Sequence, residues 1–413
     1  MGLSKYVPLR SIWLLQLYAS EVYQRGLIRD SAVEATDAEL PVLVSSMLCD
    51  AVERRMSEQL SVAFETESGN LNRVRGKIDV YHTARHQLLE KGKVRCQYET
   101  LSLDGPVNRY LLRALNTAMH KVQAFGDTAL TRRCRRLVNA FRYNGVTLVE
   151  TLGYPGSRLS PRDHTPVAVA KLLLELFVPA GGKASSGNTV EFRSRTYEET
   201  ELRKLFEKAL YGLYRYHLPT ARVTSGRRMR WPGTENSNAA VPEMETDIII
   251  KQPSGEHLIV DAKFTSMATT VRQGNRPTLK SGHIYQITSY ATAYAMNEPA
   301  GTPVHGVMVY ATLGLPAGHS DLSASNFPDV QEFSIGQHRM RFAALDLTGS
   351  ARKVREAALA AVDSQSTKVT DRFSVISKIE PFNQEPSLLL YRRWILGAHQ
   401  TGIRSLKSFV NDE

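Results

Sequence analysis

A carboxylate and an ammonium group alternate with apolar residues in the segment 258–264, which reads Leu-Ile-Val-Asp-Ala-Lys-Phe. Side chains alternate between the two faces of a β-strand, so Asp261 and Lys263 share one face while Val260 and Ala262 share the other. Asp247 opens the apolar run 248–250, and the turn-forming composition of residues 252–256 predicts a hairpin between the two segments. We therefore expect Asp247 to reach the same patch as Asp261 and Lys263.

Burying these charged side chains without a partner would cost several kcal/mol of desolvation free energy each, so we expect them to bind a partner such as a cation. Two carboxylates supply the hard oxygen ligands that Mg²⁺ prefers, and the ion could activate a water molecule and stabilise the charge that develops on a phosphodiester. Lys263 would orient or deprotonate that water and help to neutralise the transition state. The alternative is an ordinary surface hairpin with a fortuitous Asp-x-Lys, since so short a motif is common.

Two further features favour the chemical interpretation. Gln286 and Tyr290 are four residues apart in an expected helix, so both lie on one face, where they could border the site. Residues 203–230 contain eight Lys or Arg against the single acid Glu207, a local excess suited to tracking phosphates. The arginines that we expect to bind DNA are Arg222, Arg227, Arg228 and Arg230. His283 adjoins the same helix and could contact phosphate, although a histidine that merely begins a helix explains it equally well.

The elements that would position these residues follow an α/β plan. Periodic apolar residues predict helices over 201–217, 283–296 and 351–362, and strands over 246–250, 257–264, 304–312 and 340–347. Upstream, helices are expected over 11–23, 43–60, 108–124 and 167–177, and an exposed strand over 73–80. The sequence thus predicts an α+β N-terminal domain followed by an α/β domain with a mixed central sheet flanked by helices.

The 413 residues favour two domains over one. The Pro- and Gly-rich stretch 153–166 is the preferred boundary, which gives domains 1–160 and 161–413. A second Gly-rich stretch, 179–188, is expected to be an internal loop. It is no P-loop, because Phe177 takes the first glycine position and Ala184 replaces the magnesium-binding hydroxyl residue.

The net charge of +11 fits a polyanionic partner, most often nucleic acid. Four arginines between 132 and 136 could touch phosphates, but a solvated helix face is the more common explanation. The three cysteines are too far apart in sequence for a disulfide framework or a metal knuckle, so a reducing, cytoplasmic compartment is expected. The longest apolar run, 167–178, is too short to span a bilayer.

The spaced residues Asp247 and Asp261-Ala262-Lys263 resemble the PD-(D/E)xK nuclease signature, and Gln286 with Tyr290 resembles the Q-x-x-x-Y element of one branch of that superfamily. Most of the chain resembles the McrC family, the nuclease subunits of McrBC-type modified-cytosine-dependent restriction systems. The second domain carries the specific matches: Leu205-Phe206-Glu207, and Tyr285-Gln286 followed by Tyr290 and Tyr294. In the first domain the matching positions are residues 14–19, 75–79, Tyr98, Asp104 and Asn108-Arg109.

The resemblance implies a restriction-endonuclease-like fold in the second domain and a set of roles for its residues. Asp247, Asp261 and the backbone carbonyl of Ala262 would hold Mg²⁺, with Mn²⁺ as a substitute. Glu207 would belong to the catalytic set, although its offset from the apolar stripe of its helix suggests a solvated charge. The chain departs from the family pattern at Thr246, where the family has Pro, and Glu245 could substitute as a ligand.

The leading hypothesis is a Mg²⁺-dependent DNA endonuclease subunit of a restriction or antiviral defence complex. By resemblance, recognition of modified DNA and translocation would belong to a McrB-like AAA+ GTPase hexamer, whose hydrolysis the first domain would stimulate by inserting into the ring. Nuclease domains that dimerise could cut both strands. Two alternatives remain open: a catalytically silent adaptor that activates an NTPase ring and binds DNA, and a Q-x-x-x-Y exonuclease acting on DNA ends.

Overall fold

The computed structural model describes residues 7–35, 39–156, 159–176, 199–232, 243–267, 278–313 and 329–363. The loop expected at 179–188, which includes the segment compared above with a P-loop, lies outside these residues.

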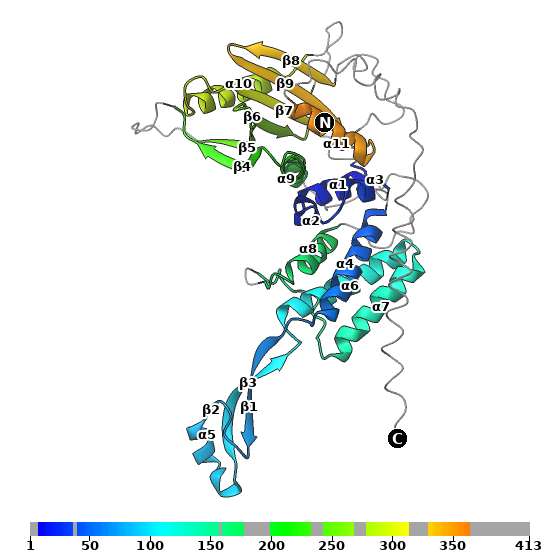
Figure 1. Cartoon of the computed structure of the whole chain (residues 1–413), viewed down its shortest axis with the longest axis vertical. Helices are drawn as coiled ribbons and strands as arrows, with labels where there is room; N and C mark the ends of the chain where they lie inside the picture. The colour runs from blue at the N-terminus through cyan, green and yellow to red at the C-terminus, as the bar shows by residue number, and fades with distance from the viewer. Residues whose placement is uncertain are drawn as a thin grey trace, which may run out of the picture. The chain divides into compact units, whose positions relative to one another are not determined.

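A six-stranded mixed sheet forms the centre of the C-terminal half (Figure 1). Its strands are β4 (Arg222–Met229), β5 (Met244–Lys251), β6 (His257–Lys263), β7 (Val304–Thr312), β8 (Val330–Ile335) and β9 (His338–Asp346), in the order β4-β5-β6-β7-β9-β8. The pairs β6–β7 and β7–β9 are parallel, and the other pairs are antiparallel. The expected α/β class with a mixed central sheet is therefore confirmed.

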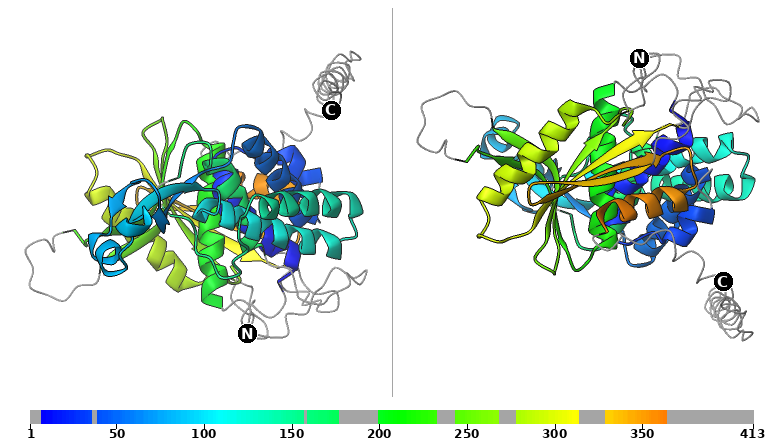
Figure 2. Two further views of the ribbon diagram at one scale, coloured as in Figure 1. Left: turned by 90° about the horizontal axis from the view of Figure 1, so that it is seen from below. Right: turned by 90° about the horizontal axis from the view of Figure 1, so that it is seen from above.

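Helices cover both faces of this sheet: α9 (Glu199–His217) and α11 (Ala351–Val362) on one face, and α10 (Ser281–Met296) on the other (Figure 1). Ile248 and Val260 belong to the core that includes Phe206 of α9, whereas Ile249 and Ile259 belong to the core that includes Ile287 of α10. The alternation predicted from sequence thus separates two apolar layers. Both views in Figure 2 show α9 (green) running across the strands.

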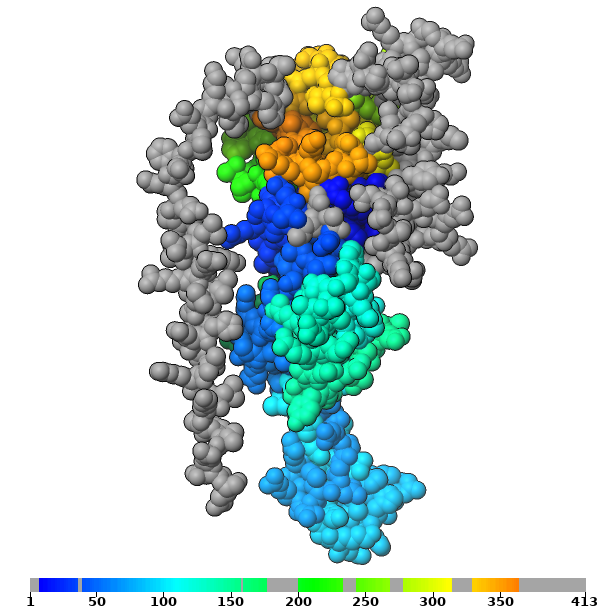
Figure 3. Space-filling model, turned by 90° about the vertical axis from the view of Figure 1, so that its right-hand side faces the viewer, coloured from blue at the N-terminus to red at the C-terminus, as the bar shows by residue number. Residues whose placement is uncertain are grey.

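The first helices of the chain pack against this half. The helix expected over 11–23 is broken into α1 (Leu9–Ala19) and α2 (Glu21–Gln24), because Ser20 is extended and caps α2. The Ser11 hydroxyl donates to the Leu347 carbonyl over 2.7 Å, and α3 (Asp30–Ala35) contacts α11. Figure 3 shows the surface of α11 (orange) next to that of the N-terminal helices (blue). These contacts join residues that precede the boundary expected near residue 160 to residues that follow it. The division into two domains at that boundary therefore remains a prediction.

The crossing of α1 and α9 depends on Gly212. A Cβ atom at this position would lie 2.0 Å from the Tyr18 carbonyl oxygen, inside any allowed contact distance. We expect Gly212→Ala to lower the free energy of unfolding by roughly 2 kcal/mol, because overpacking outweighs the better helix propensity of alanine. Denaturant titration would measure the change.

The matched control is Gly282→Ala in the first turn of α10, where the added Cβ would meet no atom within 4 Å. That variant should be neutral or slightly stabilised. Equal stability of the two variants would contradict the proposed packing constraint.

A second group of helices consists of α4 (Leu40–Ser57), α6 (Pro106–Ala124), α7 (Thr128–Tyr143) and α8 (His164–Glu175). A buried ion pair of 2.6 Å joins Arg55 of α4 to Asp163 at the start of α8. In the arginine run of α7, Arg133 pairs with Asp50 and Glu53 of α4, while its arginine neighbours are exposed. One of the four arginines therefore serves helix packing, and the others match the expected solvated face.

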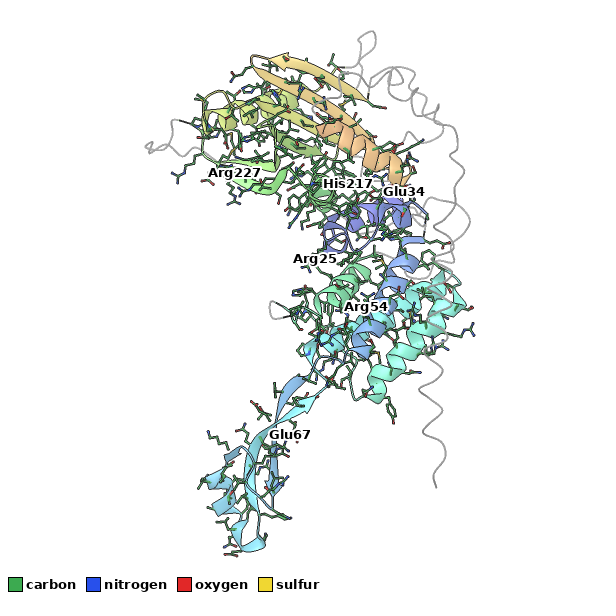
Figure 4. The ribbon with its side chains drawn as sticks, in the orientation of Figure 1. Arg25, Glu34, Arg54, Glu67, His217 and Arg227 are labelled. Atoms are coloured by element: carbon green, nitrogen blue, oxygen red, sulfur yellow. The ribbon has the colours of Figure 1, made fainter. Side chains whose placement is uncertain are left out.

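A small three-stranded sheet, which we call the arm, occupies residues 63–102. It comprises β1 (Ala63–Leu71), β2 (Lys77–Ile78), the short helix α5 (Val80–Arg85), a 3₁₀ turn at Leu89–Lys91 and β3 (Val94–Ser102), in the sheet order β1-β3-β2. Glu67, labelled in Figure 4, lies on β1. The sequence did not predict the long β1–β3 ladder.

The strand expected over 73–80 is wrong outside residues 77–78. Gly76 adopts φ +69°, and a Cβ there would lie 2.3 Å from the Gln97 carbonyl oxygen. At the other end, the Asp79 side chain accepts the His82 N–H over 2.9 Å and thereby begins α5. A left-handed residue and a helix cap thus confine the strand to two residues, despite the alternating pattern.

Candidate active site

Asp247 and Asp261 meet where β5 and β6 part. The antiparallel pairing ends at the pair Ile248 and Val260. Asp247 immediately precedes Ile248, and Asp261 immediately follows Val260, so both carboxylates lie just beyond the last pair. There the Asp247 Oδ2 atom accepts the Ala262 N–H over 2.8 Å, so a side chain takes the place of a ladder hydrogen bond. By strand alternation both carboxylates and Lys263 lie on the face covered by α10. The structure therefore brings together the three residues that the sequence singled out.

Lys263 and Asp261 form an ion pair at the end of β6. The Lys263 Nζ atom lies 2.6 Å from Asp261 Oδ2, and the two side chains are 19% and 3% exposed. Burial raises the pKa of Asp261, and the Lys263 ammonium and the Arg203 guanidinium oppose that rise. The carboxylate is thus held by neighbouring cations in a place that water barely reaches.

Asp247 has the more perturbed acidity. Burial, followed by the charge of Asp261, raises the pKa of Asp247 to about 7, and Glu207 adds to the rise. Like charges that disfavour each other's ionisation in this way are relieved by a bound cation. The pair is therefore electrostatically suited to a divalent metal ion.

Gln286 and Tyr290 of α10 border the carboxylates, as their spacing predicted. The Gln286 Nε2 atom donates to Asp261 Oδ1 and to the Tyr290 hydroxyl, each over 3.2 Å. Both side chains are half-buried. Gln286 consequently fixes the orientation of Asp261 from the side opposite Lys263.

Glu207 of α9 approaches the same centre. Its side chain is half-buried rather than solvated, and burial, followed by the charges of Glu245 and Asp261, raises the pKa of Glu207. Arg203, one helical turn earlier on the same face, acts electrostatically on both Glu207 and Asp261. Sequence reasoning placed Arg203 in the basic region but did not assign it to the centre, although its i, i+4 spacing to Glu207 was a usable signal.

The family of the chain follows from comparison with known proteins. The family model described as McrBC 5-methylcytosine restriction system component matches residues 9–311, well over half of the chain and inclusive of all the residues above. The chain belongs to the McrBC family. The resemblance that the motifs carried is confirmed at this level.

Two solved structures of McrBC assemblies are similar to this McrBC family member. One is a half-complex from a tetradecameric assembly of Thermococcus gammatolerans McrB AAA+ hexamers with bound McrC, at 16% identity over 83% of this chain and 75% of that chain, with a TM-score of 0.41. The other is the cryo-EM structure of the Thermococcus gammatolerans McrBC complex, at 17% identity over 51% of this chain and 59% of that chain, with a TM-score of 0.31. No curated protein matches the chain.

Asp247 and Asp261 are two neighbouring, largely buried carboxylates of raised pKa, which is a donor set of the kind that Mg²⁺ can use. Within the ranges that the structure describes, no three His, Cys, Asp or Glu side chains converge as a metal-binding group. Mg²⁺ commonly uses one or two carboxylates and keeps its waters. Asp247, Asp261 and the carbonyl group of Ala262 would satisfy that requirement.

The arginines expected to bind DNA lie on or beside the edge strand β4 (Arg227 in Figure 4). Arg228 and Arg230 lie 3.6 and 3.8 Å from Glu245 and Glu243, and Arg227 lies 4.0 Å from Glu298. The Arg228 and Arg230 contacts are long and exposed, so they hold these two arginines weakly. Arg227 is held more firmly, because Glu298 is largely buried and the guanidinium group also lies over the Tyr294 ring. Arg222 is exposed. All four lie along one sheet edge, where phosphates could displace Glu243 and Glu245.

No helix among the residues that the structure describes is both long and apolar enough to cross a membrane.

The buried thiols of Cys49 and Cys134 lie 3.5 Å apart between α4 and α7, and both cysteines are free.

Proposed function

We propose that this chain is the nuclease subunit of a McrBC-like restriction system, a Mg²⁺-dependent DNA endonuclease of the PD-(D/E)xK type. The observation that carries the proposal is the convergence of Asp247, Asp261 and Lys263 at the parting of β5 and β6, with Gln286 bonded to Asp261. Neighbouring carboxylates whose pKa values are raised, beside a lysine, are typical of functional sites.

Different residues of the chain would have different roles in phosphodiester hydrolysis. Bound Mg²⁺ would activate a water molecule and stabilise charge on the phosphate. The Lys263 ammonium, fixed by Asp261, would orient the attacking water and balance the charge of the transition state. Gln286, held by Tyr290, keeps Asp261 in place, and Glu207 supplies a further carboxylate at the edge of the centre.

The N-terminal part, in this proposal, engages a McrB-like AAA+ GTPase hexamer and stimulates its hydrolysis through the arm. The arm presents exposed apolar side chains, among them Phe64, Val80 and Tyr81, that no neighbouring core covers. Between residues 73 and 95 it carries seven Lys or Arg against two acids. Exposed apolar and basic side chains together are typical of a surface that meets a partner.

Dimerisation of two nuclease domains would allow both DNA strands to be cut.

We also propose that the protein acts in the cytoplasm, where free thiols such as those of Cys49, Cys96 and Cys134 stay reduced.

Metal binding by calorimetry tests the site. We expect Mg²⁺ or Mn²⁺ to bind the wild-type chain and to lose measurable affinity in Asp247→Asn. Because the pKa of Asp247 is raised to about 7, its proton must leave before the metal binds. Affinity should therefore rise with pH between 6 and 8, by up to about tenfold per pH unit below the pKa.

Asp346→Asn, an exposed change at the end of β9, is the control and should bind metal as wild type does. The adaptor function is the second candidate, since the described residues include no group of three metal-binding side chains. Absence of any binding that depends on Asp247 and Asp261 would favour the adaptor.

A further inference from the structure

His283 lies in the first turn of α10, one turn before Gln286, and is half-buried. Its Nδ1 atom is 2.9 Å from the Tyr310 hydroxyl. Tyr310 belongs to β7 and stands directly opposite Lys263 in the parallel pairing of β6 and β7. The histidine is thus fixed next to the lysine of the cleavage centre.

Tyr310 fixes the orientation of the His283 ring. The Tyr310 hydroxyl lies 2.9 Å from His283 Nδ1 and 3.1 Å from the Met308 sulfur atom. The tyrosine thus meets the imidazole at Nδ1, which leaves Nε2 as the nitrogen that can meet a phosphate. The two rings also pack together, with centroids 5.6 Å apart.

Two ammonium groups act electrostatically on this imidazole. Lys263 lies in β6 opposite Tyr310, and Lys280, whose Nζ atom donates to the Thr265 hydroxyl over 3.1 Å, directly precedes α10. Burial, followed by these two ammonium groups, lowers the pKa of His283, so the imidazole is neutral near pH 7. Adjacent cations repel one another, and an anion bound among them would relieve the repulsion and favour the imidazolium ion.

We propose that His283 and Lys280 bind a phosphate of the DNA strand on the Lys263 side of the cleavage centre, and that His283 takes up a proton when DNA binds. This contact would be separate from the arginines of the β4 edge. The inference rests on the proposed nuclease function, because it requires DNA to enter this centre.

The test uses the full chain, a 24-base-pair duplex and EDTA, which prevents cleavage during the measurement. Fluorescence anisotropy would give the Kd of wild type and of His283→Gln between pH 5.5 and 8.0. We expect the ratio of variant to wild-type Kd to be near 1 at pH 8.0 and to rise to several-fold, up to about tenfold, at pH 5.5. Lys280→Met should weaken binding at every pH and reduce the salt dependence by about one phosphate contact.

Other groups of the cleavage centre also titrate over this pH range, so their effect on DNA binding must be separated from that of His283. Asp247, Asp261 and Glu207 have raised pKa values and gain protons as the pH falls, but they are present in both proteins and cancel in the ratio. Burial raises the pKa of Tyr310, which stays protonated throughout. Tyr310→Phe removes the hydrogen-bond partner of His283 Nδ1 and should reproduce part of the His283→Gln effect.

His120→Gln, an exposed change on α6, and Lys353→Met, an exposed change on α11, are the controls and should leave the Kd unchanged. Tight DNA binding with a ratio that does not change with pH would overturn the role of His283. Failure of the wild-type chain to bind DNA at any pH would instead reject the nuclease function, and the inference with it.

Discussion

Asp261→Asn is expected to reduce DNA cleavage by the assembled complex roughly a thousandfold or more, which corresponds to about 4 kcal/mol of transition-state stabilisation. Asparagine keeps the shape of aspartate and can still accept the Gln286 amide at Oδ1. It loses the charge that would hold the metal and that pairs with Lys263 at 2.6 Å. The fold should survive because the lost charge is replaced by a neutral group of equal size.

Cleavage would be measured on closed circular and on linear DNA, with the ring partner and its nucleotide present. Assembly, followed by light scattering, and the partner's NTP hydrolysis should both match wild type. Asp346→Asn again serves as the control. Undiminished cleavage by Asp261→Asn would remove this residue from the site, and cutting restricted to linear DNA would favour an exonuclease acting on ends.

Shortening the arm should have the second large effect, which is loss of the partner's stimulation. Leu71 of β1 stands directly opposite Val94 of β3, so the two-residue turn Asn-Gly can replace residues 72–93 and close the hairpin. The change removes β2, α5 and most of the exposed apolar and basic side chains, including Val80 and Tyr81. We expect the NTP hydrolysis of the ring to fall to the rate of the ring alone.

A measurement of metal binding would distinguish loss of stimulation from misfolding of the shortened chain. The shortened chain should bind Mg²⁺ at Asp247 and Asp261 with wild-type affinity, because the arm makes no part of that centre. Cys96, buried in β3, is replaced by Ser in the variant, and Cys96→Ser alone is the control. Full stimulation by the shortened chain would show that the ring is engaged elsewhere.

Local sequence patterns predicted much of the fold and the centre of the site. Alternation correctly placed Asp261 and Lys263 together, and i, i+4 spacing correctly placed Gln286 and Tyr290 on one helix face. Helix 351–362 and strand 304–312 have the predicted bounds. These features depend on neighbours within a few residues, which is the range over which periodicity carries information.

Elements that depend on distant partners were missed. Strands β1 and β8 consist largely of half-buried or exposed residues, so their apolar alternation is weak, and β4 was recognised only as a basic segment. Each is a strand because another segment supplies its hydrogen bonds: β3, β9 and β5, respectively. Strand formation of this kind is a property of the pairing rather than of the segment.

The sequence by itself determined which side chains share a face, and therefore that two carboxylates and a lysine could act together. Only the tertiary structure decided their chemistry. The pKa of Asp247 is raised because strands and helices from separate parts of the chain exclude water from it and bring Asp261 and Glu207 close. Likewise, Glu207 is half-buried at the centre instead of solvated, because α9 packs against the sheet. Desolvation and charge coupling arise from packing between distant segments, and no local pattern encodes them.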